Sequence, residues 1–157
     1  MLLQLQRIKS INTNRNTHSR LYNEDTFYRA FIADLSKAKS EVIIESPFMT
    51  TRRISMLMPS LLKLKKRGVR ITISTRDPEE GDTLRLDSHK ALSMLLHEGI
   101  HVTFTEGLHR KIAIIDETKL WEGSLNILSQ NNSREIMRRT KSRDACYQML
   151  KFMKANR

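Results

Sequence analysis

Two strand-forming segments lie close together in the stretch His109-Arg-Lys-Ile-Ala-Ile-Ile-Asp-Glu-Thr-Lys-Leu-Trp-Glu-Gly123. The segments are residues 109–115 and 119–123, and only residues 116–118 separate them. A connection this short joins antiparallel neighbours. The stretch therefore predicts a β-hairpin.

Upstream of this hairpin, helical patterns alternate with short β-branched runs. The expected strands are residues 42–44, 69–74 and 101–105. Four helices are expected. The first begins with Asn23 as its N-cap, and the second extends from Ile54 to Gly68, with Pro59 at a kink or in the first turn. The third extends from Asp87 or Ser88 to Gly99, and the fourth comprises residues 142–153. This alternation is typical of crossover units. We predict an α/β fold with a mixed, largely parallel central sheet flanked by helices on both faces.

The length and composition fit one soluble domain. The 157 residues can bury one hydrophobic core, and we interpret 1–22 as a basic arm or edge element and 23–157 as a single domain. No stretch approaches the roughly 20 apolar residues of a membrane helix, and the start lacks a secretory signal. Because Cys146 has no partner cysteine, we interpret it as a core residue and expect a cytoplasmic protein.

The net charge of +11, from 28 Lys and Arg against 17 Asp and Glu, indicates a polyanionic partner. Nucleic acid is the leading candidate, while anionic lipid surfaces attract the same charge and many basic domains have only a solvated basic face. The acids between Asp77 and Asp87 lack the positional pattern of a calcium loop. We interpret them as a solvated loop and expect no metal site.

A strand that begins at His109 places His109 and Lys111 on one face and Ile112 and Ile114 on the other, because alternate side chains point to opposite sides. Imidazole is a nucleophile towards phosphorus, and a neighbouring ammonium group neutralises charge that builds on phosphate oxygens. Asp116, at the end of the strand, either orients an imidazole or anchors the turn. The pattern predicts chemistry at a phosphate.

The segment His109-Arg-Lys-Ile-Ala-Ile-Ile-Asp116 resembles the H-x-K-x4-D motif of the phospholipase D superfamily. Gly123-Ser-Leu-Asn126 follows where members of that superfamily carry G-S-x-N. Residues 41–48 and 67–74 resemble the family's first strands, and Glu135 occupies the position of a late carboxylate. The resemblance covers residues 24–155 and implies that the domain is catalytic.

The resemblance implies a role for each motif residue. His109 attacks the phosphodiester to form a phosphohistidine, while Lys111 and Asn126 hold the phosphate oxygens. Ser124 adds a hydrogen bond there, and Glu135 holds the imidazole in its attacking tautomer. Asp116 is interpreted as structural. Water then regenerates the enzyme, and the family's usual scheme uses no metal or other cofactor.

The same scheme needs a second, protonated histidine that gives its proton to the leaving oxygen. Most members obtain it from a second motif copy, whereas this chain has one copy. The other histidines are interpreted as structural: His18, His89, His97 and His101. In this respect the chain resembles the family's small single-motif nucleases. We therefore predict an isologous homodimer in which the second His109 is the general acid.

A basic run follows the motif and predicts a groove that tracks a nucleic acid backbone, although a solvated rim has the same pattern. Its candidate residues are Arg134, Arg138, Arg139 and Lys141. Trp121 is interpreted as a core or interface residue rather than a platform for base stacking.

The favoured function is a metal-independent DNA nuclease with little sequence preference, which could serve as the cutting part of a larger defence or repair assembly. One alternative keeps the chemistry but acts on phospholipids, as a phospholipase D or phosphatidyl transferase. Another is a catalytically silent nucleic-acid-binding module that retains the fold.

Overall fold

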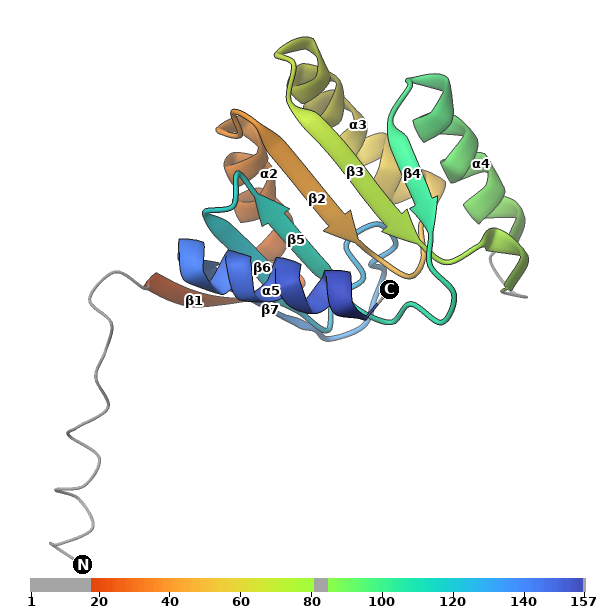
Figure 1. Ribbon diagram of the computed structural model, residues 1–157. Helices are drawn as coiled ribbons and strands as arrows, with labels where there is room; N and C mark the ends of the chain where they lie inside the picture. The colour runs from red at the N-terminus through yellow and green to blue at the C-terminus, as the bar shows by residue number, and fades with distance from the viewer. Residues whose placement is uncertain (1–17, 81–84, 157) are drawn as a thin grey trace, which may run out of the picture.

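The computed structural model describes residues 18–80 and 85–156, which fold around a seven-stranded sheet (Figure 1). The strand order is β1-β7-β6-β5-β2-β3-β4. The strands are β1 (His18–Asn23), β2 (Glu41–Glu45), β3 (Arg70–Thr75), β4 (His101–Phe104), β5 (Ile112–Ile115), β6 (Lys119–Gly123) and β7 (Ile136–Lys141). β1 is an edge strand, while residues 1–17 of the expected arm lie outside the described residues.

The sheet is mixed, as predicted, but its parallel part is smaller than expected. The parallel part consists of β2, β3 and β4. In the remaining order β1-β7-β6-β5-β2, each strand pairs antiparallel with the next. Helices connect the parallel strands. The predicted hairpin of β5 and β6 is confirmed, and a turn as short as residues 116–118 can join only antiparallel neighbours.

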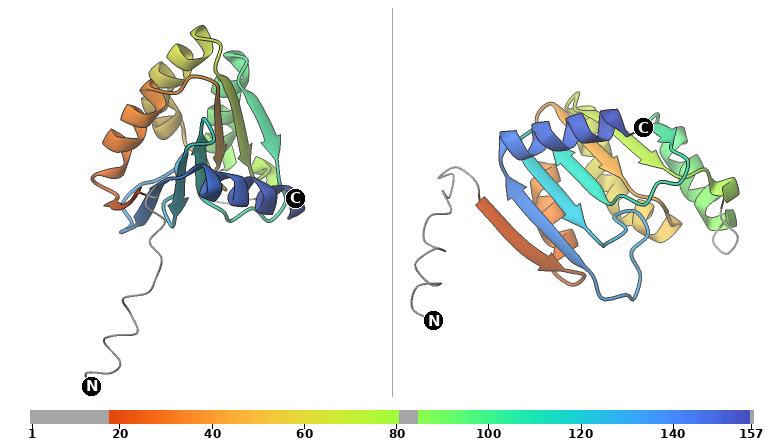
Figure 2. Two further views of the ribbon diagram at one scale, coloured as in Figure 1. Left: turned by 60° about the vertical axis from the view of Figure 1, so that its left-hand side comes forward. Right: turned by 60° about the horizontal axis from the view of Figure 1, so that its bottom comes forward.

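Helices cover both faces of the sheet, as predicted. Figures 1 and 2 show α2 (Phe27–Ser36), α3 (Thr51–Lys66) and α4 (Arg85–His97) on one face and α5 (Arg143–Ala155) across the other. A short 3-10 helix, η2 (Pro78–Glu80), precedes α4. The large core lies under the first three helices, and a smaller one, with Ile112, Ile114, Leu120, Cys146 and Met153, lies under α5.

Trp121 and Cys146 are both core residues, as the sequence predicted. Trp121 is fully buried, its ring centroid is 5.2 Å from that of Phe27, and its Nε1 donates to Asp34 Oδ2 at 3.1 Å. Cys146 lies on the buried face of α5, and this burial raises the pKa of its thiol to about 11. A thiol with that pKa stays protonated and unreactive at neutral pH.

One helix prediction needs correction, and one of the two alternatives for Pro59 is excluded. The N-cap of α2 is Thr26, whereas Asn23 ends β1 and stabilises the turn before the helix: its Oδ1 accepts hydrogen bonds from the main-chain N–H groups of Asp25 and Thr26 at 3.2 and 3.1 Å. This turn delays the start of α2 to Phe27. Pro59 lies inside α3, beyond its first turn.

Candidate active site

The ends of four strands meet at one edge of the sheet. β5 is antiparallel to β2 and β6, and β6 is antiparallel to β7. The start of β5 therefore lies beside the ends of β2 and β6, close to the start of β7. In this register Ile112 pairs with Glu45 on one side and Glu122 on the other, while Gly123 pairs with Met137.

His109 and Lys111 lie in the segment that leads into β5, because the strand itself begins at Ile112. His109 is exposed, and within residues 18–80 and 85–156 no group hydrogen-bonds its imidazole. Lys111 is half-buried, and its Nζ donates to the main-chain oxygen of His109 at 2.7 Å. The ammonium group thus lies beside the residue predicted to be the nucleophile.

Ser124 and Asn126 follow β6 at the same edge. Ser124 Oγ accepts from the N–H of Ile136 at 3.1 Å, and its own N–H donates to the carbonyl of Ile136 at 2.9 Å. Asn126 Oδ1 is buried and has no hydrogen-bond partner among the described residues. An unpaired buried amide oxygen is rare in folded proteins, so Asn126 is a candidate for a ligand contact.

Two residues that the sequence did not single out hold the segment after Asn126. Tyr28 Oη donates to the carbonyl of Ile127 at 2.7 Å, and Arg53 Nε donates to that of Gln130 at 2.7 Å. The Arg53 guanidinium lies 4.2 Å from the centroid of the Tyr28 ring. Burial raises the pKa of Tyr28, so its hydroxyl remains a neutral donor.

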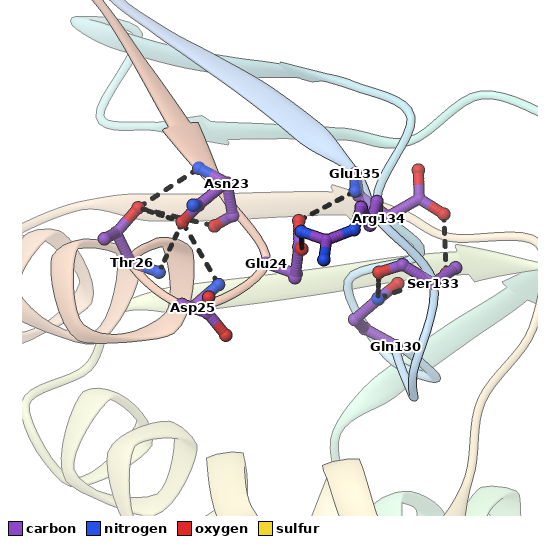
Figure 3. A network of polar contacts seen from close by, with 8 residues as sticks. All are labelled: Asn23, Glu24, Asp25, Thr26, Gln130, Ser133, Arg134 and Glu135. Atoms are coloured by element: carbon purple, nitrogen blue, oxygen red, sulfur yellow. Dashed lines mark hydrogen bonds and ion pairs between the residues drawn. The ribbon is translucent and has the colours of Figure 1, made fainter.

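A polar network precedes β7 (Figure 3). Glu135 Oε1 accepts from Ser133 Oγ at 2.7 Å, and the main-chain N–H of Glu135 donates to Glu24 Oε2 at 2.8 Å. That amide, together with the nearby Arg134 guanidinium, lowers the pKa of Glu24. The predicted hydrogen bond between Glu135 and the His109 imidazole is absent from the described part of this single chain and stays a prediction.

This arrangement has known counterparts. A family model described as "Cardiolipin synthase, PLD-like domain" matches residues 31–156, which is most of the chain. The chain belongs to the phospholipase D superfamily. A search of curated proteins finds no match.

Solved structures share the superfamily fold with this chain. Nuc from Salmonella typhimurium, a phospholipase D family member, is 16% identical with a TM-score of 0.72, and the match covers 88% of this chain and 93% of Nuc. NucT from Helicobacter pylori is 18% identical with a TM-score of 0.66, covering 88% and 94%. TrmBL2, an archaeal chromatin protein, is 13% identical with a TM-score of 0.61, covering 99% of this chain and 57% of TrmBL2.

In this superfamily member, Asp116 lies at the opposite end of β5 from His109. Its carboxylate accepts hydrogen bonds from the N–H groups of Lys39, Ser40 and Glu41 and from Ser40 Oγ, at 2.8–3.0 Å. Partial burial opposes ionisation, but these donors outweigh it and lower the pKa of Asp116. Asp116 therefore ties the β5–β6 turn to the chain that enters β2, a structural role.

The four basic residues of the predicted groove lie apart. Arg138 faces the α5 side, whereas Arg139 faces α2 with its Nη1 3.4 Å from both carboxylate oxygens of the buried Asp34. Lys141 ends β7, far from the site, and only Arg134 lies at its start, with a side chain 97% exposed. Because neighbouring residues of a strand point to opposite faces, the run does not line one groove.

The described residues of this superfamily member contain neither a cluster of metal-binding side chains nor a membrane-spanning helix. Across 18–80 and 85–156, no group of three or more His, Cys, Asp or Glu side chains is placed to hold a metal ion. None of the helices described is long and apolar enough to cross a membrane. The chain has the fold and the motif of a phosphodiesterase.

Proposed function

We propose that this chain is a metal-independent nuclease that cleaves DNA with little sequence preference. The observation that carries the proposal is that the segments with His109, Lys111, Ser124 and Asn126 lie at one edge of the sheet. The exposed imidazole is open to a substrate, and groups able to bind phosphate oxygens lie on the segments beside it. Such an arrangement suits nucleophilic attack on phosphorus.

In the first step, the unprotonated nitrogen of the His109 imidazole attacks phosphorus. The N–P bond forms while the P–O bond to the leaving group breaks, and the protonated His109 of a second copy gives its proton to the leaving oxygen. Lys111 and Asn126 bind the non-bridging oxygens as their charge builds. Water then attacks the phosphohistidine, gives a proton to the second His109, and restores the first.

A second copy supplies the general acid because the other histidines of the described chain lie outside the motif segments, His97 at the end of α4 among them. His18 and His101 lie at the opposite end of the sheet, where they pair with Lys141 and Thr72. His89 Nε2 lies 2.8 Å from Glu79 Oε1, outside the motif segments. We therefore propose a homodimer with one composite site, formed by both copies of His109.

A groove beside the site supports this dimer. Lys111 and Gly123 line it together with three large apolar side chains that are more than half exposed, Leu21 (54%), Ile136 (59%) and Phe152 (54%). Exposed apolar clusters mark interaction surfaces. α5 leaves this part of the sheet uncovered (Figure 2). A second copy related by a two-fold axis would cover the groove and bring the two Lys111 segments together.

Charge favours a nucleic acid as the substrate. The net charge is +11, and Arg134 extends from the start of β7 beside the site. A phosphodiester backbone is attracted to such a surface independently of base sequence. TrmBL2, which shares the fold, is described as binding DNA, and this supports the choice of DNA by analogy only.

The test is cleavage of plasmid and single-stranded DNA in excess EDTA. Wild-type protein is expected to cleave, and His109→Ala is expected to be inactive because it lacks the nucleophile. His101→Ala is a matched control, because His101 is also exposed but starts β4 at the far end of the sheet. Absence of cleavage, or equal cleavage by His109→Ala, would refute the proposal.

The description of the matching family favours a second candidate, a phospholipid substrate with the same chemistry. Release of headgroup from vesicles of anionic phospholipid, measured beside DNA cleavage, separates the two. Faster turnover of the vesicles would replace the nuclease with a phospholipase D or phosphatidyl transferase.

The likeness to a chromatin protein favours a third candidate, a binding module without catalysis. Such a module would bind DNA with an affinity that falls steeply with salt. It would give no phosphohistidine when a reaction is quenched and the protein analysed, whereas the nuclease is expected to give one.

A further inference from the structure

Arg110, the residue between His109 and Lys111, makes a partly buried ion pair through two hydrogen bonds. Its Nε donates to Glu45 Oε2 at 2.6 Å and its Nη2 donates to Glu45 Oε1 at 3.2 Å. The Glu45 side chain is 5% exposed and that of Arg110 is 23% exposed. A fork of this kind fixes the guanidinium in orientation as well as in distance.

The pair ties the site segment to two other elements. Glu45 is the last residue of β2, and Arg110 Nη1 also donates to the main-chain oxygen of Asn156, just after α5, at 3.2 Å. The guanidinium therefore points to the α5 side of the sheet, as do Ile112 and Ile114. One side chain joins the entry to β5 with the end of β2 and the end of α5.

Few other polar contacts hold residues 109–111 in place. Outside the strand ladders, no main-chain hydrogen bond involves residues 109–111 in the described chain. The side chains of Arg110 and Lys111 provide the polar contacts that fix it, and that of Lys111 reaches only back to His109. The Lys111 contact stays within the segment, so outside the strand ladders the Arg110 side chain provides the polar contacts that join residues 109–111 to the rest of the described chain.

We propose that Arg110 and Glu45 are positioning residues that hold the His109 imidazole in line with the phosphorus. This inference rests on the proposed phosphodiesterase activity. Neither residue touches the substrate; both act through the main chain on each side of Arg110. Displacement of a nucleophile by about 1 Å can lower a rate by roughly 100-fold, so a tether on this segment controls turnover more than binding.

The test compares Arg110→Lys and Glu45→Gln with the wild type on bis(p-nitrophenyl) phosphate, a small substrate that reaches only the catalytic groups. Lys keeps the charge but cannot form the fork, and Gln keeps a hydrogen-bonding group but loses the charge. We expect kcat to fall by about 10-fold to 100-fold in each variant while KM changes by less than about 2-fold. The rate of phosphohistidine formation in a single turnover should fall equally.

Arg70→Lys is the matched control. Arg70 pairs with Glu41 at 3.3 Å at the other end of β2, and its side chain is 76% exposed. This variant should keep the wild-type kcat. Melting curves of all variants confirm that they fold.

Wild-type kcat in both Arg110→Lys and Glu45→Gln would overturn the inference, as would a rise in KM with kcat unchanged. Loss of cooperative folding in both would also overturn it, because the pair would then serve stability alone. Failure of the proposed function has a different signature: the wild type itself would form no phosphohistidine, or His109→Ala would retain activity.

Discussion

Gly123 and Ile136 pack main chain against main chain: a Cβ at Gly123 would lie 2.1 Å from the carbonyl oxygen of Ile136. Both contacting groups belong to strands, so neither can rotate away. Gly123→Ala is expected to force β6 from β7 and to lower the free energy of unfolding by about 2–3 kcal/mol. Urea denaturation measures this change. Cleavage should fall as well, because Ser124 joins the two strands at this point.

A glycine in open space provides the control for this prediction. Gly68 has a positive φ of 77°, and nothing lies within 4 Å of the position of its Cβ. Asn tolerates that conformation better than other non-glycine residues. Gly68→Asn should therefore cost less than Gly123→Ala. An equally large loss in both would show that crowding at Gly123 is not the cause.

The sequence predicted those parts of the fold that depend on local spacing, while the roles of the site residues stay predictions. The hairpin follows from three connecting residues, and it places the segments that carry His109 and Ser124 at one edge of the sheet without any distant contact. The parallel part of the sheet was overestimated because strand direction after β4 depends on which neighbours the chain joins.

Contacts between distant segments could not be predicted. Arg110 and Glu45 are 65 residues apart, and the amide of Glu135 meets a carboxylate 111 residues away. A charged residue directly after the apolar run 42–44 was the available signal for Glu45, since a buried carboxylate needs a partner. The basic run was misread as one groove because clustering in sequence ignores the alternation of a strand.

The Arg139–Asp34 ion pair gives a second prediction. Arg139 is 14% exposed and lies over the Trp121 ring, so Asp34→Asn leaves a buried guanidinium without its counter-charge. We expect a loss of about 3–5 kcal/mol in the free energy of unfolding. Lys119 contacts the same carboxylate at 3.9 Å, which adds to the loss.

The double variant Asp34→Asn with Arg139→Met tests the cause of this loss. Because the uncompensated charge is removed, the double variant should be more stable than Asp34→Asn alone. If the two losses simply add, the two side chains contribute independently and the ion pair is not the source of the stability.

The lowered pKa of Asp116 predicts that the free energy of unfolding depends on pH. Its pKa is lower in the folded chain than in the unfolded chain, because the amides of residues 39–41 bind the ionised form. The unfolded chain therefore binds the proton more tightly. The contribution of the ionised Asp116 to the free energy of unfolding is complete above the unfolded pKa of about 4. It is lost as the pH falls through that value and then through the folded pKa.

Asp116→Asn should accordingly be less stable than the wild type at pH 7, and the difference should shrink between about pH 5 and pH 3. Urea denaturation across this range measures both. Asp25→Asn is a control, because Asp25 is exposed and no main-chain N–H of the described residues donates to its carboxylate. A difference that stays constant with pH would mean that the ionised carboxylate is not what the amides stabilise.

The apolar groove beside the site predicts the effect of charge on assembly. Leu21 and Ile136 face the groove from β1 and β7, and both side chains are more than half exposed in the single chain, so Leu21→Glu and Ile136→Glu should leave the fold intact. If a second copy covers the groove, two buried like charges would face each other across the two-fold axis. Light scattering should then show a monomer, and cleavage should fall with it, because each monomer lacks the second His109.

Leu86→Glu is the control, since Leu86 is 71% exposed on α4, on the other face of the sheet. A dimer that persists in both groove variants would place the interface elsewhere, and a monomer that still cleaves at the wild-type rate would remove the need for a second histidine.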